Sequence, residues 1–317
     1  MKHILKSKQN FDLEAIPPYD FDLSIRKAIE ITRGFPPLKD ELLNGVYWTT
    51  LRGPPIIGMK VRSLGTREKP KISCTLFSEN RLTNKEEEKA LEEVGWLLGL
   101  NEDLSDFYRL SQGNSVLDRA VKGLYGLRII KGPYVFGSLI TAIRLQNAPV
   151  RRSNAMIAYL VQSYGEPVTF EGRTYYAPLI PAALSRATIT DLREKGKLGY
   201  RAAYIKALAN EFSPDTEKRL EKLSTEKAKK ELMRFKGVGE FTAEFALVGA
   251  RHNGKRRYDV FPVDSWSSRL YLSFFFPKED FSALSKEEIL HKARDHARDL
   301  WGNWRGLVWQ YLTKSLL

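Results

Sequence analysis

Along the first hundred residues, apolar and polar positions alternate in short segments, which is the pattern of half-buried β-strands. In "GMKVRSL", Met59 and Val61 fall on one face while Lys60 and Arg62 fall on the other, and "KISCTLF" alternates in the same way. "GVYWTTLRG" has the β-branched and aromatic content of a third strand and is followed by a Pro-Pro turn. These segments predict an antiparallel sheet.

Further along the chain, the apolar residues have the spacing of helices instead of the alternation of strands. A capping box of Thr83 and Glu86 opens a helix, and from about residue 106 the strand signals fade into helical segments separated by short Gly, Pro or Asn breaks. The exception is "EPVTFEGRTYYAP" at 166–178, which predicts a loop or a small hairpin. We therefore expect an α+β N-terminal domain at 1–105, in which an antiparallel sheet packs with helices, and a mostly α-helical region at 106–317.

The net charge of the chain indicates which kind of partner it could bind. The 317 residues include 51 Lys and Arg against 38 Asp and Glu, a formal net charge of +13. This excess favours a polyanionic partner such as nucleic acid, although a merely basic surface would also explain it.

Cys74 is the single cysteine, so a disulfide within the chain and a Cys-rich zinc or iron–sulfur site are excluded. We expect His291 and His296 at the surface. With no apolar run near ~18 residues and no signal peptide, we expect an intracellular protein that does not enter a membrane.

The segment "FKGVGEFTAEFALVGA" at 235–250 combines a glycine turn with an apolar helix. Gly237 and Gly239 flank Val238 and allow a ligand to approach the backbone closely. The helix begins near Glu240 or Phe241, so its first N–H groups face the turn, and together they form an anion site suited to a DNA phosphate. A plain helix–turn–helix is the alternative, because Gly-x-Gly alone has low specificity.

Asp264 stands between apolar neighbours in "FPVDSW" and precedes another apolar helix. Asp is a favoured N-cap, and capping alone would explain it. The N–H groups of the helix would also stabilise the ionised carboxylate. An ionised carboxylate near a phosphate-binding turn is suited to stabilising positive charge on a sugar, and cleavage of a glycosidic bond has such an oxocarbenium-like transition state.

These two segments resemble the helix-hairpin-helix and Gly/Pro-Asp motifs of the HhH-GPD DNA glycosylases. "LQNAPVRRSNAMIAYLVQSYGEP", "LGYRAAYIKALANEF" and "WGNWRGLVWQYL" occur in the order the family has, and "PPYDFDL" resembles the start of the 3-methyladenine DNA glycosylase II branch. The resemblance implies a glycosylase core of two helical lobes at 106–317, with a hairpin at 226–250 and an aspartate loop at 259–266. It implies that Asp264 is catalytic and that the phosphate-binding hairpin consists of Phe235, Lys236, Gly237, Val238, Gly239 and Glu240.

The resemblance also implies the remaining parts of such a site. Phe241 stands where bifunctional members carry a Schiff-base lysine, which implies a monofunctional enzyme that uses water, with Lys236 the nearest amine for a lyase step. An extruded base leaves a gap in the duplex, and Gln146 and Asn147 would fill it as a wedge unless they only end a helix. The candidates for the base pocket, any of which could instead belong to the core, are Tyr134, Phe136, Phe241 and Trp266.

Basic residues complete the expected DNA interface. Arg151 and Arg152 open the helix after the wedge and are expected to contact the DNA backbone. "RHNGKRRYD" at 251–259 is either a further phosphate contact or a solvated loop. The resemblance implies no cofactor, except for a monovalent cation that the carbonyls of the hairpin could hold.

The substrate remains open between alternatives. We expect double-stranded DNA with an alkylated base, processed by a monomeric base excision repair enzyme to an abasic site. Asn147 looks more like the 8-oxoguanine branch, because the alkylation branch has Leu at this position, so a glycosylase for oxidised or deaminated purines is one alternative. A helix-hairpin-helix DNA-binding protein without catalysis is another, and the carboxylate of Asp264 argues against it.

Overall fold

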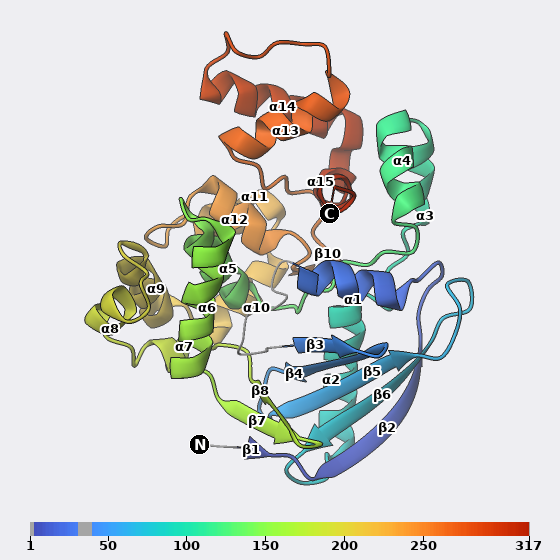
Figure 1. Cartoon of the computed structure of the whole chain (residues 1–317), viewed down its shortest axis with the longest axis vertical. Helices are drawn as coiled ribbons and strands as arrows, with labels where there is room; N and C mark the ends of the chain where they lie inside the picture. Colours follow the sequence, from blue (N-terminus) through green and yellow to red (C-terminus); the bar gives the residue numbers. More distant parts are fainter. Residues whose placement is uncertain (1–2, 31–39, 317) are drawn as a thin grey trace. The chain divides into compact units, whose positions relative to one another are not determined.

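The computed structural model describes residues 3–30 and 40–316 (Figure 1). It divides into two compact units. Unit 1 comprises residues 1–103 and 126–213, and unit 2 comprises residues 104–125 and 214–317. The chain therefore leaves unit 1 after Asp103 and returns to it at Gly126. A single domain boundary at residues 105/106, with two helical lobes beyond it, stays a prediction.

A five-stranded antiparallel sheet with the strand order β2-β6-β5-β4-β3 forms much of unit 1 (Figure 1). The strands are β2 (Ser7–Glu14), β3 (Asp40–Leu43), β4 (Val46–Leu51), β5 (Ile57–Ser63) and β6 (Lys71–Ser78). The three strands expected from the sequence are confirmed as β4, β5 and β6. The alternation in β5 holds as well, because Met59 and Val61 are buried and Arg62 is exposed.

Two helices, α1 (Phe21–Ile29) and α2 (Asn84–Leu98), pack with this sheet in one core. The core includes Phe21, Ile25, Met59, Val61, Ile72, Cys74, Val94 and Leu98. The predicted capping box is confirmed, since the Thr83 side chain accepts from the Glu86 N–H and the Glu86 carboxylate accepts from the Thr83 N–H. Burial raises the pKa of Cys74 to about 12, so its thiol stays protonated and unreactive.

A second sheet of three strands joins distant parts of unit 1. In it, β1 (His3–Ile4) runs parallel to β7 (Pro167–Phe170), which runs antiparallel to β8 (Arg173–Tyr176). Of the loop or small hairpin expected at 166–178, the hairpin is thus confirmed. It packs on the large sheet, where the ring centroids of Phe170 and Phe77 lie 4.9 Å apart. Gly58 permits this contact, because a Cβ there would come within 2.6 Å of the Phe170 ring.

The rest of unit 1 is helical, as expected. Its helices are α5 (Val135–Leu145), α6 (Val150–Tyr164), α7 (Pro181–Leu184), α8 (Ile189–Glu194) and α9 (Arg201–Glu211). Helix α9 packs against α5, α7 and α8, and α5 also packs against α6. The turn between α5 and α6 is therefore held by helices on both sides.

Unit 2 is almost entirely helical. Its elements are α3 (Ser105–Gln112), α4 (Ser115–Gly123), α10 (Pro214–Lys222), α11 (Thr225–Leu232), α12 (Glu240–Leu247), β9 (Arg251–His252), β10 (Lys255–Arg256), α13 (Ser265–Phe275), α14 (Lys286–Trp301), η2 (Gly302–Trp304) and α15 (Arg305–Lys314). Within residues 3–30 and 40–316, no helix has the length and apolar character needed to cross a membrane.

The core of unit 2 corrects one expectation. His296 was expected at the surface, but it is half-buried, and its Nδ1 lies 2.9 Å from the hydroxyl of the buried Tyr271. The same hydroxyl accepts a 2.7 Å hydrogen bond from the Trp301 indole. Burial lowers the pKa of His296, which favours the neutral imidazole. His291, by contrast, is exposed as expected.

Candidate active site

Helices α11 and α12 form the predicted helix–turn–helix. Gly237 in the turn has φ +83°, in the left-handed region that side chains disfavour. Val238 is buried, and its N–H donates to the Phe235 carbonyl at 3.1 Å. Helix α12 begins at Glu240, and its N-cap Gly239 has no side chain with which to cap it. The first N–H groups of α12 are therefore suited to an external anion.

Gly239 provides a direct test of this anion site. Its φ of −89° and ψ of −178° are accessible to any residue, and a Cβ there would meet no atom within 4 Å. Gly239→Ala should therefore cost at most about 1 kcal/mol of stability. It should weaken binding to a DNA duplex at least about tenfold, because the methyl group would obstruct a phosphate approaching the helix N-terminus. Fluorescence anisotropy and thermal unfolding would measure the two effects.

The matched control is Gly123→Ala at the end of α4, where a Cβ also meets nothing within 4 Å. This variant should keep both its stability and its DNA affinity. Unchanged DNA affinity of a folded Gly239→Ala protein would contradict a phosphate site at the turn.

Asp264 is the N-cap of α13, as expected. Its Oδ1 accepts hydrogen bonds from the N–H groups of Trp266 at 3.1 Å and Ser267 at 2.8 Å, and the Ser267 hydroxyl lies 2.7 Å from the same oxygen. The Asp264 N–H donates to that hydroxyl in turn, which completes a capping box. No residue that the structure describes donates to Oδ2, and the residue is exposed. The cap thus fixes the carboxylate through one oxygen and leaves the other for a ligand.

Two of the predicted pocket aromatics lie in unit 2 near these features in sequence. Trp266 follows Asp264 by two residues and is 72 % exposed, so it is not a core residue. Phe241 lies in the first turn of α12 and is partly exposed, with its ring centroid 6.0 Å from that of Phe245. Lys236 is exposed in the turn itself. The surroundings of Asp264 therefore include an accessible aromatic surface.

The other two pocket candidates lie in unit 1. The Tyr134 hydroxyl donates to Glu93 at 2.8 Å, and the Arg52 guanidinium lies 4.2 Å from the centre of its ring. Phe136 is 1 % exposed and packs at 5.4 Å from Phe212. Phe136 therefore belongs to the core of unit 1 in this structure, and the pocket role of both residues stays a prediction.

The predicted wedge, Gln146 and Asn147, forms the turn between α5 and α6. Asn147 is exposed and has φ +46°, an uncommon conformation for a residue with a side chain. The buried Arg201 donates to the Gln146 carbonyl from Nε at 3.0 Å and also from Nη2. The Tyr200 hydroxyl lies 3.4 Å from both the Gln146 carbonyl and the Asn147 amide. Arg201, the first residue of α9, and Tyr200, directly before it, thus contact the turn and hold it in place.

Tyr200 and Arg201 contact this turn from the start of α9, and sequence reasoning missed them. Tyr200 is 46 % exposed beside the exposed Asn147, so its ring is available to a ligand of the turn. The sequence singles out their segment, "LGYRAAYIKALANEF", only by its place in the order of motifs. An aromatic–arginine pair at a helix start was the available signal. Arg151 and Arg152 are exposed in the first turn of α6, as expected.

Within the basic segment 251–259, residues 251–256 form a short hairpin, β9–β10, which corrects the expectation of a loop there. Lys255 is exposed, but Arg257 is only 2 % exposed. Its guanidinium donates to the carbonyls of Leu220 and Leu223 at 2.6 and 2.7 Å and to the Thr225 hydroxyl at 2.9 Å. Arg257 therefore ties α10 to α11 and is not available for a phosphate.

Known proteins include two that are similar to this chain in sequence. No protein-family model matches the chain. It is 25 % identical over 167 residues to a DNA-3-methyladenine glycosylase of Bacillus subtilis (strain 168), a match covering 52 % of this chain and about half (54 %) of that protein. It is also 25 % identical over 221 residues to a "Probable N-glycosylase/DNA lyase" of Methanothermobacter thermautotrophicus, covering 63 % of this chain and 69 % of that protein.

Solved structures decide the fold. The 3-methyladenine DNA glycosylase of Archaeoglobus fulgidus has a TM-score of 0.76 at 23 % identity, over 97 % of this chain and 99 % of that one. The 8-oxoguanine glycosylase/lyase of Clostridium acetobutylicum has a TM-score of 0.72 at 19 % identity, over 99 % and 100 %. The chain has the HhH-GPD glycosylase fold. The fold that the resemblance implies is thereby confirmed.

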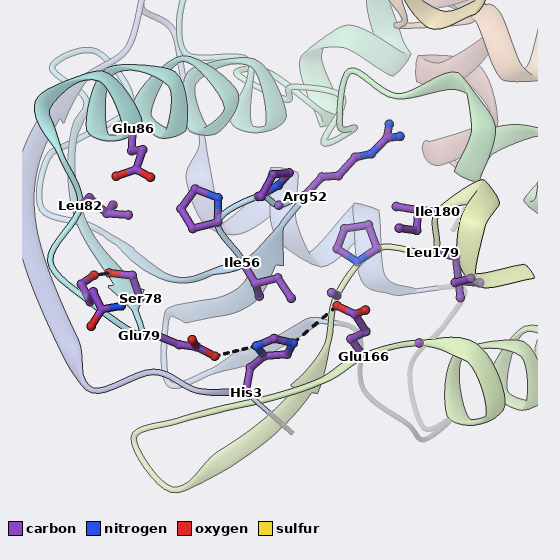
Figure 2. A pocket seen from close by; sticks show the side chains of 18 of the residues that line it. His3, Arg52, Ile56, Ser78, Glu79, Leu82, Glu86, Glu166, Leu179 and Ile180 are labelled. Atoms are coloured by element: carbon purple, nitrogen blue, oxygen red, sulfur yellow. Dashed lines mark hydrogen bonds and ion pairs between the residues drawn. The ribbon is translucent and has the colours of Figure 1, made fainter. Parts of the chain in front are cut away.

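One cavity of this HhH-GPD fold lies wholly within unit 1 (Figure 2) and measures about 460 Å³. His3 lies at its edge between two carboxylates, with Nδ1 2.6 Å from Glu79 and Nε2 3.6 Å from Glu166. The two nitrogens face opposite carboxylates and do not converge on one point. None of the predicted site residues lines this cavity, and no metal-binding cluster of His, Cys, Asp and Glu occurs in the described part of the chain.

Proposed function

We propose that this protein is a monofunctional DNA glycosylase that releases a damaged, extruded base and leaves an abasic site. The observation that carries the proposal is Asp264, whose Oδ1 is fixed by the α13 N-terminus while Oδ2 receives no hydrogen bond from any described residue. The α11–α12 hairpin in the same unit supplies the place for a DNA phosphate. The glycosylase names of the two sequence relatives support the same activity.

The proposed chemistry follows from the charge of the carboxylate. As the bond between the sugar C1′ and the base nitrogen breaks, the base leaves with the electron pair and the sugar acquires oxocarbenium character. Opposite charges about 4 Å apart at an effective dielectric near 20 attract by about 4 kcal/mol, which corresponds to roughly a thousandfold in rate. Water then forms the new bond to C1′, its proton passes to the Asp264 carboxylate or to solvent, and the departing base takes up a proton.

The proposed substrate is an alkylated base. Alkylated bases are electron-poor, and electron-rich aromatic rings stack well on them. Trp266, exposed two residues after Asp264, is the aromatic side chain that best fits this role in the described structure. A second candidate is an oxidised or deaminated purine, favoured by Asn147, which is exposed at the tip of the predicted wedge beside Tyr200.

Phe241 supports the monofunctional assignment, because it offers no amine for a Schiff base. Lys229 of α11 lies close to α12, but its ammonium is paired with Glu240 at 3.1 Å and with Glu226 at 3.3 Å. Lys236 is the remaining amine in the turn, and it is exposed. We propose that Lys236 contacts a phosphate and does not act as a nucleophile.

One experiment tests both the proposed substrate and the monofunctional reaction. It measures base release from duplexes that each carry one lesion: an alkylated purine, ethenoadenine, hypoxanthine, uracil or 8-oxoguanine. We expect release of the alkylated bases and strand breaks only after hot alkali, because water leaves an intact abasic site. Breaks without alkali would assign an amine to the reaction and point to Lys236. Tight binding without any release would favour a DNA-binding protein without catalysis.

The proposal extends to the rest of the interface. Arg151, Arg152 and Lys255 are exposed cations suited to the DNA backbone, so affinity should fall steeply as salt increases. We propose a monomer that needs no redox cofactor. A monovalent cation at the hairpin is also proposed, since backbone carbonyl oxygens of a turn are ligands that such ions accept.

A further inference from the structure

The proposed phosphate site carries a negative side chain at its edge. Glu240 is the first residue of α12 and directly follows Gly239, so its carboxylate starts from the same turn as the N–H groups that would bind phosphate. An acidic residue in the first turn stabilises a helix. It would also repel a phosphate that approaches the same helix end.

Two cations from neighbouring helices converge on this carboxylate. The Lys229 ammonium of α11 lies 3.1 Å from Glu240 Oε1, and Nη1 of Arg294 from α14 lies 3.3 Å from the same oxygen. Arg294 also makes a two-bond pair with Glu244 of α12, at 3.0 and 2.8 Å. Both cations therefore bind α12 on the side where it meets α11 and α14.

The exposed fractions of the side chains show that both cations are mostly buried. The side chain of Lys229 is 14 % exposed, that of Arg294 is 17 % exposed and that of Glu244 is 6 % exposed, while Glu240 remains 42 % exposed. Burial raises the pKa of Glu240, but the hydrogen bond from Lys229 and the charge of Arg294 outweigh it and lower the pKa on balance. The Glu240 carboxylate is therefore ionised at neutral pH, and its charge is balanced within the protein.

We infer that Lys229 and Arg294 are positioning residues of the phosphate-binding hairpin, which neutralise the Glu240 carboxylate and hold it against α11 and α14, away from an incoming DNA phosphate. Neither residue needs to touch DNA for this. The inference rests on the proposed function only in that the hairpin binds a DNA phosphate, and it does not require base release.

A double-mutant cycle between Lys229 and Glu240 tests the inference. Lys229 is chosen because it lies 3.6 Å from the buried Glu244, whereas Arg294 is the main partner of Glu244 and its removal would endanger the fold. Anisotropy would measure binding to an undamaged duplex of about 20 base pairs at low and high salt. Lys229→Met should weaken binding about tenfold at low salt and less at high salt, where the exposed charge of Glu240 is screened.

Adding Glu240→Gln should restore the DNA affinity that Lys229→Met removes. Lys229→Met/Glu240→Gln should bind within about twofold of the native protein, and Glu240→Gln alone should change affinity less than about threefold, because its charge is already balanced. Lys229→Arg, which keeps the positive charge, should bind like the native protein. Lys230→Met is the matched control: Lys230 is an exposed neighbour on α11 and should have a smaller effect than Lys229.

Two results with the variants would overturn the inference. Native affinity of Lys229→Met would show that the pairing does not matter. A loss that Glu240→Gln fails to restore, with the salt slope reduced by about one, would show that Lys229 itself contacts a phosphate. If Lys229→Met does not fold, Lys229→Gln takes its place in the same cycle. Base release is not part of the measurement, so a failure of the proposed catalysis leaves the cycle intact, whereas no DNA binding by the native protein would overturn both.

Discussion

Replacing Asp264 with asparagine is expected to reduce base release about a thousandfold while DNA affinity stays within about threefold of native. Asparagine is as good an N-cap as aspartate, so its carbonyl oxygen can still accept from Trp266 and Ser267 and hold α13 in place. What disappears is the negative charge opposite the developing oxocarbenium ion. Single-turnover release of an alkylated base, with anisotropy for binding, would measure the two quantities.

The control for this variant is Asp280→Asn, which removes an exposed carboxylate between α13 and α14 in the same unit. It should leave base release unchanged. Release by Asp264→Asn at more than about a tenth of the native rate would contradict the proposed mechanism, because the charge would then contribute little to the transition state. Loss of DNA binding by the same variant would instead point to a role of Asp264 in binding.

Replacing Arg257 with methionine is expected to lower the free energy of unfolding by about 3 to 5 kcal/mol. The change leaves the carbonyls of Leu220 and Leu223 and the Thr225 hydroxyl without their buried donor. Thr225 in turn donates to Asp259 at 2.9 Å, so the damage extends to the aspartate loop. Urea unfolding followed by circular dichroism would measure the loss.

Lys255→Met is the matched control in the same basic segment, because Lys255 is exposed on the β9–β10 hairpin. It should keep its stability within about 0.5 kcal/mol and weaken DNA binding if this hairpin contacts a phosphate. A loss below about 1 kcal/mol for Arg257→Met would mean that water can replace the guanidinium at its acceptors.

Much of the fold could be predicted from sequence because its signals are local. The alternation around Met59 and Val61 depends only on neighbouring residues, and so does the capping box of Thr83. The pairing of β1 with β7 had no such signal, because a strand of two residues, His3–Ile4, has no measurable period. The burial of His296 and Arg257 was also missed, since each depends on partners contributed by other elements of unit 2.

The residues of the candidate site also differ in whether the local sequence could identify them. Gly237, Gly239 and Asp264 could be identified because a turn and an N-cap are properties of a few consecutive residues. Arg201 braces the Gln146 carbonyl, 55 positions earlier in the chain. Arg294 pairs with Glu240, 54 positions earlier. One sequence does not show which partner either arginine contacts, because each partner lies on an element far away along the chain.

The parallel pairing of β1 with β7 has a consequence for synthesis of the protein. His3 pairs with Val168, about 165 residues later in the chain, and Leu5 is buried beside Val168 and Phe170. At about 5 to 20 residues per second, a ribosome needs roughly 8 to 33 seconds to supply that partner. For the part of this time that follows the synthesis of Phe77, the apolar face that Leu5, Trp48 and Phe77 share has no cover. The nascent chain should therefore present a chaperone-binding surface that disappears once residues 167–176 have left the exit tunnel.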